Sequence, residues 1–243
     1  MLLEIISQRK KTLDSFRPFN KDLEQNLTQW IRTELTYTSN AIEGNTLTRQ
    51  ETELVINKGI TIAGKTINEH LEARNHAKAF EWILEQSKLN LPLTEIFIKN
   101  IHQTILSGIN TENAGRYRQV PVRISGSTVI MPNYVKIPDL MKNLIEILTQ
   151  NATLHPVTQA SEAHYHLVSI HPFIDGNGRT ARLLMNHILM LHGYPPAVIG
   201  PSDRITYINS LEEAQLGGSK NNYEHFIQQS VLNALENYLE SFL

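Results

Sequence analysis

The chain of 243 residues contains no cysteine, which excludes disulfide bridges, a thiol nucleophile and a cysteine-ligated zinc site. It has no excess of charge of either sign, since 22 basic residues stand against 24 acidic ones. A protein without a basic field is not expected to bind nucleic acid or an anionic membrane as its main task. No apolar run reaches the ~18 residues that a membrane-spanning helix needs. We therefore expect a soluble, cytoplasmic protein.

Helical periodicity dominates the sequence instead. Apolar residues recur every three to four positions in several stretches, as they do on one face of an amphipathic helix. These stretches are Leu23–Leu35, Ile96–Ile105, Leu140–Leu148, Ala160–Val168, Leu184–Leu191 and Ile227–Tyr238. Capping-box patterns at Thr48–Glu51 and Thr66–Glu69 indicate helix starts. Helix ends are indicated by Gly44, Gly59 and Gly193.

One stretch departs from this period. Val120, Val122 and Ile124 alternate with other residues, and a Ser-Gly-Ser turn follows. This pattern predicts a short β-hairpin over residues 118–131. Because a lone hairpin is only marginally stable, it should pack on the helical body or on a partner.

The domain organisation is expected to be simple, since no shift in composition marks a linker. We expect an all-α fold in which the hairpin forms a flap. Residues 1–65 should form a helical N-terminal extension that packs with a catalytic domain, residues 66–243, as one unit.

The most informative segment is His-Pro-Phe-Ile-Asp-Gly-Asn-Gly-Arg-Thr-Ala-Arg, residues 171–182. The proline after His171 disfavours the α conformation there, so one helix should end at His171 and the next begin near Asn177. Free N–H groups and the positive end of the dipole meet at such a helix start and form an anion site. Arg179 and Arg182, three residues apart, favour a polyphosphate ligand.

The remaining polar residues of this segment fit the same chemistry. Gly176 and Gly178 let the backbone approach a ligand closely. Asp175 would repel phosphate unless a cation lies between them, and Mg²⁺ held by one carboxylate and by phosphate oxygens fits. His171 is suited to accept a proton from a hydroxyl. A glycine-rich turn or a His-Pro pair alone is a common helix stop, so it is the combination that favours phosphate chemistry.

The segment resembles the Fic family signature, His-Pro-Phe-x-Asp/Glu-Gly-Asn-Gly-Arg-x-x-Arg, at every specified position. The resemblance extends to the preceding flap, from Gly115-Arg-Tyr-Arg118 to Pro132, and covers roughly residues 40–240. It implies a helical domain with a β-hairpin flap that transfers AMP from ATP to a Ser, Thr or Tyr hydroxyl of a target protein docked on the flap. ATP is then the substrate and Mg²⁺ the cofactor.

The resemblance also implies a role for each residue of the site. His171 would be the general base and Asp175 would hold Mg²⁺. Nucleotide binding would fall to Gly176, Asn177, Gly178, Arg179, Thr180, Arg182 and Tyr207. Among these, Tyr207 stands where the family places an aromatic residue of the adenine pocket.

A second motif lies near the N-terminus. Ser39-Asn-Ala-Ile-Glu43-Gly44-Asn45 resembles the inhibitory helix of the family, Ser/Thr-x-x-x-Glu-Gly/Asn. Glu43 is expected in the last turn of its helix, where a carboxylate faces the negative end of the dipole at a cost of ~0.3–1 kcal/mol. A local rule that is broken without local compensation often marks function. We expect Glu43 to pair with Arg182 and to inhibit AMP transfer.

Two other functions remain open from the sequence. Glu43 could orient a water molecule for the removal of AMP from a modified protein. Alternatively, the helical body could be a binding module whose flap adds a strand to a partner, although such a module has no use for His171 and Asp175 beside an anion site. A homodimer is compatible with either activity. A histidine metal cluster is disfavoured, because His164 and His166 would point to different sides of their helix.

Overall fold

The computed structural model describes residues 1–89 and 91–242, which form helices and connecting loops without a β-strand. The α-helices are α1 Leu2–Asp14, α2 Lys21–Ile42, α3 Arg49–Glu53, α4 Ile67–Leu89, α5 Glu95–Ile105, α6 Ile137–Gln150, α7 Pro156–Ile170, α8 Asn177–Leu191, α9 Arg204–Gln215 and α10 Asn221–Glu240. A π-helical turn, Leu54–Lys58, continues α3, and short 3-10 turns occur at Tyr134–Lys136, Asn151–Thr153 and Pro201–Asp203. None of these helices is both long and apolar enough to cross a lipid bilayer.

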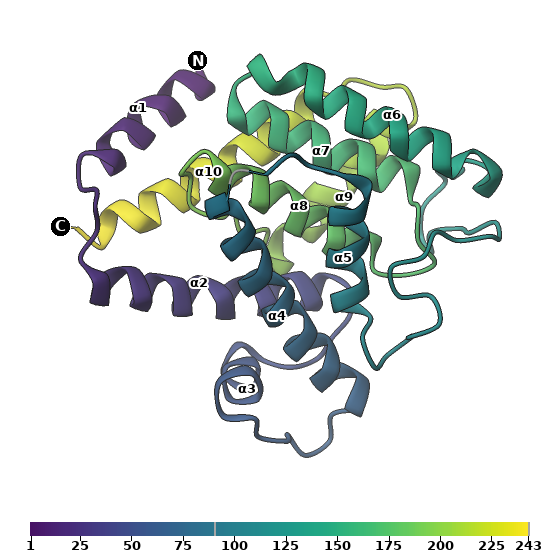
Figure 1. The fold of residues 1–243 in the computed structure, drawn as a ribbon, viewed down its shortest axis with the longest axis horizontal. Coiled ribbons are helices and arrows are strands. Elements are labelled where there is room, and N and C mark those ends of the chain that lie inside the picture. The colour runs from purple at the N-terminus through teal and green to yellow at the C-terminus, as the bar shows by residue number, and fades with distance from the viewer. Residues whose placement is uncertain (90, 243) are drawn as a thin grey trace.

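Helix α8 lies at the centre of the molecule, with α4, α5 and α7 around it (Figure 1). Most of its side chains are buried, including polar ones. Each buried polar group needs a partner: Asn186 bonds both backbone groups of Ala197, at 2.8 and 3.1 Å, and His187 lies 3.1 Å from the carbonyl oxygen of Ile83. The helix that begins at the predicted anion site is therefore firmly held.

The N-terminal helices share the main core rather than forming a layer of their own. Ile6 of α1 and Leu27 of α2 belong to the same apolar cluster as the central helices. Helix α1 lies beside α10 (Figure 1), where Phe16 stacks on Phe242 at 4.7 Å between ring centroids. This packing favours one unit, while the boundary at residue 65 stays a prediction.

The predicted helix boundaries agree with the structure. Both capping boxes form: Thr48 and Glu51 exchange side chain–backbone hydrogen bonds, as do Thr66 and Glu69. The three glycines predicted to end helices all have positive φ angles, namely Gly44, Gly59 and Gly193.

The predicted β-hairpin over 118–131 is wrong in its strands. Only the turn forms: the Ser127 N–H donates to the Ile124 carbonyl at 3.2 Å, and Gly126 has a φ of 79°. Pro121 cannot donate to a ladder, and Val129 and Met131 are buried against the helical body instead of pairing with a neighbouring strand.

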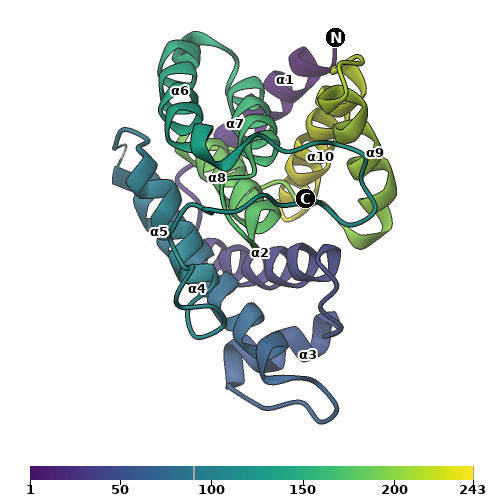
Figure 2. The ribbon, with the colours of Figure 1, turned by 90° about the vertical axis from the view of Figure 1, so that its right-hand side faces the viewer.

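The segment 119–132, called here the flap loop, is held at its tip by α9. Oε1 of Glu212 accepts hydrogen bonds from the Thr128 N–H and hydroxyl, both at 2.8 Å, and from the Ser127 hydroxyl at 3.1 Å. Figure 2 shows the teal chain reaching from α5 across to α9. The Glu212 carboxylate on α9 thus fixes the tip of the flap loop, as cross-strand hydrogen bonds would in a hairpin.

Acid should destabilise this fold before ordinary carboxylates titrate. Burial lowers the pKa of His76 and His164 to about 3, and of His102 and His187 to about 4, from an ordinary 6.5. Below pH 6.5 the unfolded chain therefore binds protons that the folded chain does not. As the pH is lowered below 6.5, the free energy of unfolding should therefore decrease by up to ~1.4 kcal/mol per pH unit for each histidine.

Urea unfolding at several pH values between 6.5 and the carboxylate range measures this slope. Replacing His76 with Gln removes one such group and should flatten the slope. A free energy of unfolding that stays constant over this range would contradict the burial of these rings.

Candidate active site

Helix α7 ends in a residue with an unusual backbone. His171 has a φ of 50° and is the one non-glycine residue in the described ranges with a positive φ. Its N–H still donates to the Leu167 carbonyl at 3.0 Å, which closes the helix. A left-handed conformation at a residue with a side chain is strained and persists only where its surroundings hold it. The surroundings of His171 are therefore part of the site.

The loop between α7 and α8 is fixed by the side chain of Asn177. Its Oδ1 accepts from the Phe173 N–H and its Nδ2 donates to the Phe173 carbonyl, both at 2.9 Å. Both ends of the amide are thus used inside the loop. Asn177 therefore sets the shape of the loop that leads into α8.

A second support comes from His102 of α5. Its ring stacks on Phe173 at 3.6 Å, and burial keeps its pKa near 4, so the imidazole is neutral. Nδ1 accepts from the Gly115 N–H at 2.9 Å, which places the ring proton on Nε2, where it is donated to the Asp175 carbonyl at 2.9 Å. His102 therefore joins the loop before the flap to the loop before α8.

The carboxylate of Glu43 occupies the start of α8. Glu43 is the C-cap of α2, and its Oε1 accepts from Nη2 of Arg182 at 2.7 Å. A Cβ at Gly178 would overlap that same oxygen, so the carboxylate lies against the first turn of α8 where glycine alone leaves room. The position predicted from the sequence to bind an anion is thus occupied by an acidic side chain of this chain.

Arg182 is hydrogen-bonded to the last turn of α2. Its Nε donates to the Ser39 hydroxyl and its Nη2 to the Ser39 carbonyl, each at 2.9 Å. Burial by itself raises the pKa of Glu43, but Arg182, with Arg179 and Arg204, outweighs burial and holds that pKa below its ordinary value. The carboxylate is therefore ionised. Arg182 and the positive end of the α8 dipole offset its unfavourable place at the end of α2.

Arg179 is also engaged by acidic side chains. Nη1 donates to Oε1 of Glu72 on α4 at 3.0 Å, and Nη2 lies 3.3 Å from the Asp175 carboxylate. The other oxygen of Glu72 accepts from Nδ2 of Asn45 at 2.8 Å. Both motif arginines are therefore paired with carboxylates in this structure, and Asn45 belongs to the same motif as Glu43.

His171 faces this charged group as a neutral ring. Its pKa is lowered to about 4, mainly by burial; Arg118 acts in the same direction, while Glu43 and Asp175 oppose the shift. The two carboxylates therefore lie within electrostatic reach of the ring. An imidazole with this pKa is unprotonated at neutral pH and can accept a proton.

Residues 92–189 match the Fic/DOC family, a range that runs from just before α5 almost to the end of α8. The chain belongs to the Fic/DOC family. The matched range contains the whole segment 171–182, so this segment lies within the Fic domain.

Curated relatives extend this similarity beyond the Fic domain. The chain is 39% identical to the protein adenylyltransferase fic-1 of Caenorhabditis elegans over 74% of its own length and 36% of that protein. It is 37% identical to the protein adenylyltransferase Fic of Drosophila grimshawi over 84% of its length and 42% of that protein. The chain thus spans less than half the length of these relatives.

Solved structures share the complete fold. A Fic domain containing signaling protein from Bacteroides thetaiotaomicron superposes with a TM-score of 0.89 at 27% identity, covering 99% of this chain and 97% of that one. The structure of Fic-1 from Caenorhabditis elegans gives 0.89 at 28% identity, covering 99% of this chain and 72% of that one. Both cover the N-terminal helices as well as the Fic domain.

Two residues assigned to nucleotide binding from the sequence lie behind the anion site of this Fic domain. The hydroxyl of Thr180 is buried and donates to the Gly176 carbonyl at 2.8 Å. Tyr207 is 1% exposed, and its hydroxyl lies 2.8 Å from Nε2 of His164. The ring of Tyr207 therefore has no open face for adenine here, and the contact it makes within the site is with Arg182.

The sequence did not reveal Glu72 or His102 as members of this Fic site. Nothing in the pattern distinguishes Glu72 from other acidic residues of α4. His102, by contrast, lies between Ile98 and Ile105 on the buried stripe of α5, and all three are fully buried. A histidine in the middle of an apolar stripe is therefore the sequence signal that could have identified His102.

The His171 imidazole should remain neutral well below ordinary histidine titration in the ligand-free protein. Burial disfavours the charged ring and brings its pKa to about 4, against an ordinary 6.5. NMR of ¹⁵N-labelled histidine, with the signal assigned through a His171→Ala variant, follows the ring across this range. A midpoint near 6.5 would show that the ring is solvated and would remove the electrostatic argument for a neutral base.

Proposed function

We propose that this chain transfers AMP from ATP to a Ser, Thr or Tyr hydroxyl of a target protein. The observation that carries the proposal is the position of a neutral His171 beside an anion site built from Arg179, Arg182 and the start of α8. The curated relatives named protein adenylyltransferases support the same chemistry.

The geometry fits an in-line displacement. The hydroxyl oxygen attacks the α-phosphorus of ATP, the bond from that phosphorus to the oxygen bridging to the β-phosphate breaks, and pyrophosphate leaves. His171 accepts the hydroxyl proton at a ring nitrogen as the new bond forms. Loop amides receive the α-phosphate, and the two arginines receive the β- and γ-phosphates, where charge-assisted bonds are strongest.

Mg²⁺ would be held by Asp175, the carboxylate of the loop. The described residues contain no group of three or more metal-ligating side chains, and Mg²⁺ is usually bound by one or two carboxylates together with substrate phosphates. The exposed Asp175 side chain suits such a shared site. A bound ion would neutralise phosphate charge, and Asp175, which now contacts Arg179, would be its protein ligand.

Glu43 would inhibit this reaction by occupying Arg182. Its carboxylate removes a ligand of the γ-phosphate and places negative charge where polyphosphate should lie. ATP that still enters would have its α-phosphate displaced from the in-line position, and a displacement of about 1 Å can cost ~10²-fold in rate.

The target protein would dock along the flap loop. Val120, Ile130 and Ile174 are exposed apolar side chains on or near this loop. Extended backbone without a ladder partner can pair with a peptide strand, which reads little side-chain identity. The homodimer and the cytoplasmic location expected from the sequence stay predictions.

Replacing His171 with Ala should abolish transfer while ATP binding remains. Loss of a general base typically lowers a rate by ~10²–10⁴-fold. Label from α-labelled ATP, counted in proteins of a lysate and in the enzyme itself, measures transfer, and ATP affinity is measured separately. His225, an exposed histidine on α10, gives a control substitution to Ala. Undiminished transfer by His171→Ala would exclude this base.

The Glu43→Gly variant should transfer AMP faster than the wild type by ~10²-fold, because Arg182 becomes free for phosphate. Glu43→Gln separates charge from bulk and should give an intermediate rate. Arg182→Ala should be inactive in either background, since the phosphate ligand is lost. Transfer by Glu43→Gly at the wild-type rate, with ATP saturating, would rule out inhibition by Glu43.

The same variants distinguish transfer from removal of AMP. If Glu43 orients a water molecule for removal, Glu43→Gly loses release of AMP from a modified protein while transfer rises. Both directions are therefore measured on one modified substrate.

A further inference from the structure

Arg118 is a buried cation at the base of the flap loop. It is 2% exposed and donates to three backbone carbonyls. Nε donates to His171 at 2.8 Å, Nη1 to Val120 at 2.9 Å and Nη2 to Pro132 at 2.7 Å. Its own N–H donates to the Pro172 carbonyl at 2.9 Å.

The charge of Arg118 is balanced by dipoles rather than by a carboxylate. It forms no ion pair with any residue in the ranges 1–89 and 91–242. One of its acceptors, the His171 carbonyl, is the C-cap of α7 and lies at the negative end of that helix. A buried charge without an acidic partner is costly unless it is hydrogen-bonded, and each of the three guanidinium nitrogens donates a hydrogen bond here.

The three carbonyls that accept from Arg118 belong to two different segments, the flap loop and the end of α7. Val120 and Pro132 stand at the two ends of the flap loop, so Arg118 closes that loop at its base. The third acceptor is the strained left-handed residue that carries the imidazole. One side chain thus fixes the flap loop and His171 relative to each other.

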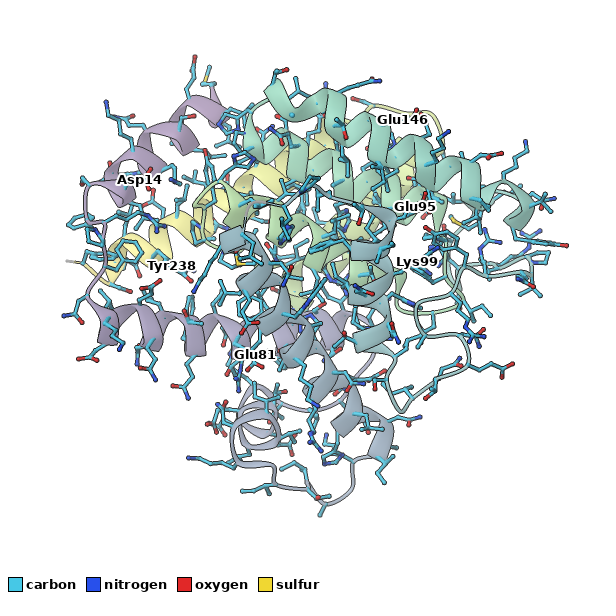
Figure 3. All side chains as sticks on the ribbon, viewed as in Figure 1. Asp14, Glu81, Glu95, Lys99, Glu146 and Tyr238 are labelled. Atoms are coloured by element: carbon cyan, nitrogen blue, oxygen red, sulfur yellow. The ribbon has the colours of Figure 1, made fainter. Side chains whose placement is uncertain are left out.

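Arg118 is itself anchored through the preceding residue. The Tyr117 hydroxyl donates to Oε2 of Glu95 at 2.8 Å, and Nζ of Lys99 lies 4.0 Å from the ring centroid of Tyr117. Figure 3 labels Glu95 and Lys99 on α5, next to the chain that leads into the flap loop. The residue before Arg118 is therefore tied to α5.

We propose that Arg118 is the positioning residue that holds the flap loop in register with His171, so that a hydroxyl on a peptide lying along the flap meets the ring nitrogen. This role rests on the proposed AMP transfer. A planar fork can reach three carbonyls at once, which a lysine ammonium cannot do in the same geometry.

The structural part of the proposal is tested by hydrogen exchange on the full chain. In Arg118→Met the His171 N–H, which bonds to Leu167, and the Thr128 N–H, which bonds to Glu212, should exchange at least ~10-fold faster because the loop and the α7 terminus lose their common anchor. Arg116→Met is the matched control, since it removes the same charge from an exposed position two residues away. Unchanged exchange in a folded Arg118→Met variant would show that Arg118 does not couple the flap loop to the end of α7.

The functional part is tested in the Glu43→Gly background. Arg118→Met should lower the rate of AMP transfer by ~10²-fold, as expected for a displaced reacting group, while the affinity for ATP alone stays within a factor of ~2 because the arginines at α8 are untouched. A loss of ATP affinity in parallel with transfer would show a general structural defect instead, and would overturn the positioning role.

Arg118→Lys keeps the charge and serves if the methionine variant does not fold. It should fall between the wild type and Arg118→Met in both exchange and transfer, and full activity would show that the fork is not needed. If Glu43→Gly transfers no AMP at all, the proposed function fails. The exchange rates still decide whether Arg118 couples the flap loop to His171.

Discussion

The pair formed by Glu43 and Arg182 at the start of α8 is the contact on which the rest of the site depends. It brings together the end of α2 and the first turn of α8, at 2.7 Å between the charged atoms. The pair is possible because three separate costs are offset at one place: the burial of a guanidinium, the partial desolvation of a carboxylate, and the position of that carboxylate at a helix C-terminus. Without α8 beside it, the sequence at the end of α2 would be locally unfavourable.

Support for the site comes from helices that carry no part of the signature motif. Helix α4 supplies Glu72 to Arg179, and α5 supplies His102 to the loop before α8. These contacts link α4 and α5 to the loop before α8 through hydrogen bonds as well as apolar packing. The N-terminal region contributes Ser39 and Glu43 from the end of α2 to the same site, and solved Fic structures cover nearly all of this chain, including the N-terminal helices.

The sequence predicted what depends on local pattern and missed what depends on packing. Helix boundaries follow from capping and periodicity and were predicted correctly, and the loop between α7 and α8 lies where the motif within 12 residues predicted it. Its phosphate-binding role stays a prediction. The strands of the flap were wrong because alternation also arises when Val129 and Met131 pack on a helical body. Tyr207 was expected to contact adenine, but its ring is buried. Helix α9 turns this residue inward toward His164, and the sequence pattern does not reveal that orientation.

The missing side chain at Gly178 limits how this protein can change. The α-carbon of Gly178 is the surface against which the Glu43 carboxylate lies, and a phosphate would approach the same surface. A side chain at this position would have to displace the Glu43 carboxylate, and under the proposed function it would stand where a phosphate is expected as well. Under that proposal, inhibition and nucleotide binding share one surface, so a substitution at Gly178 cannot alter one without affecting the other.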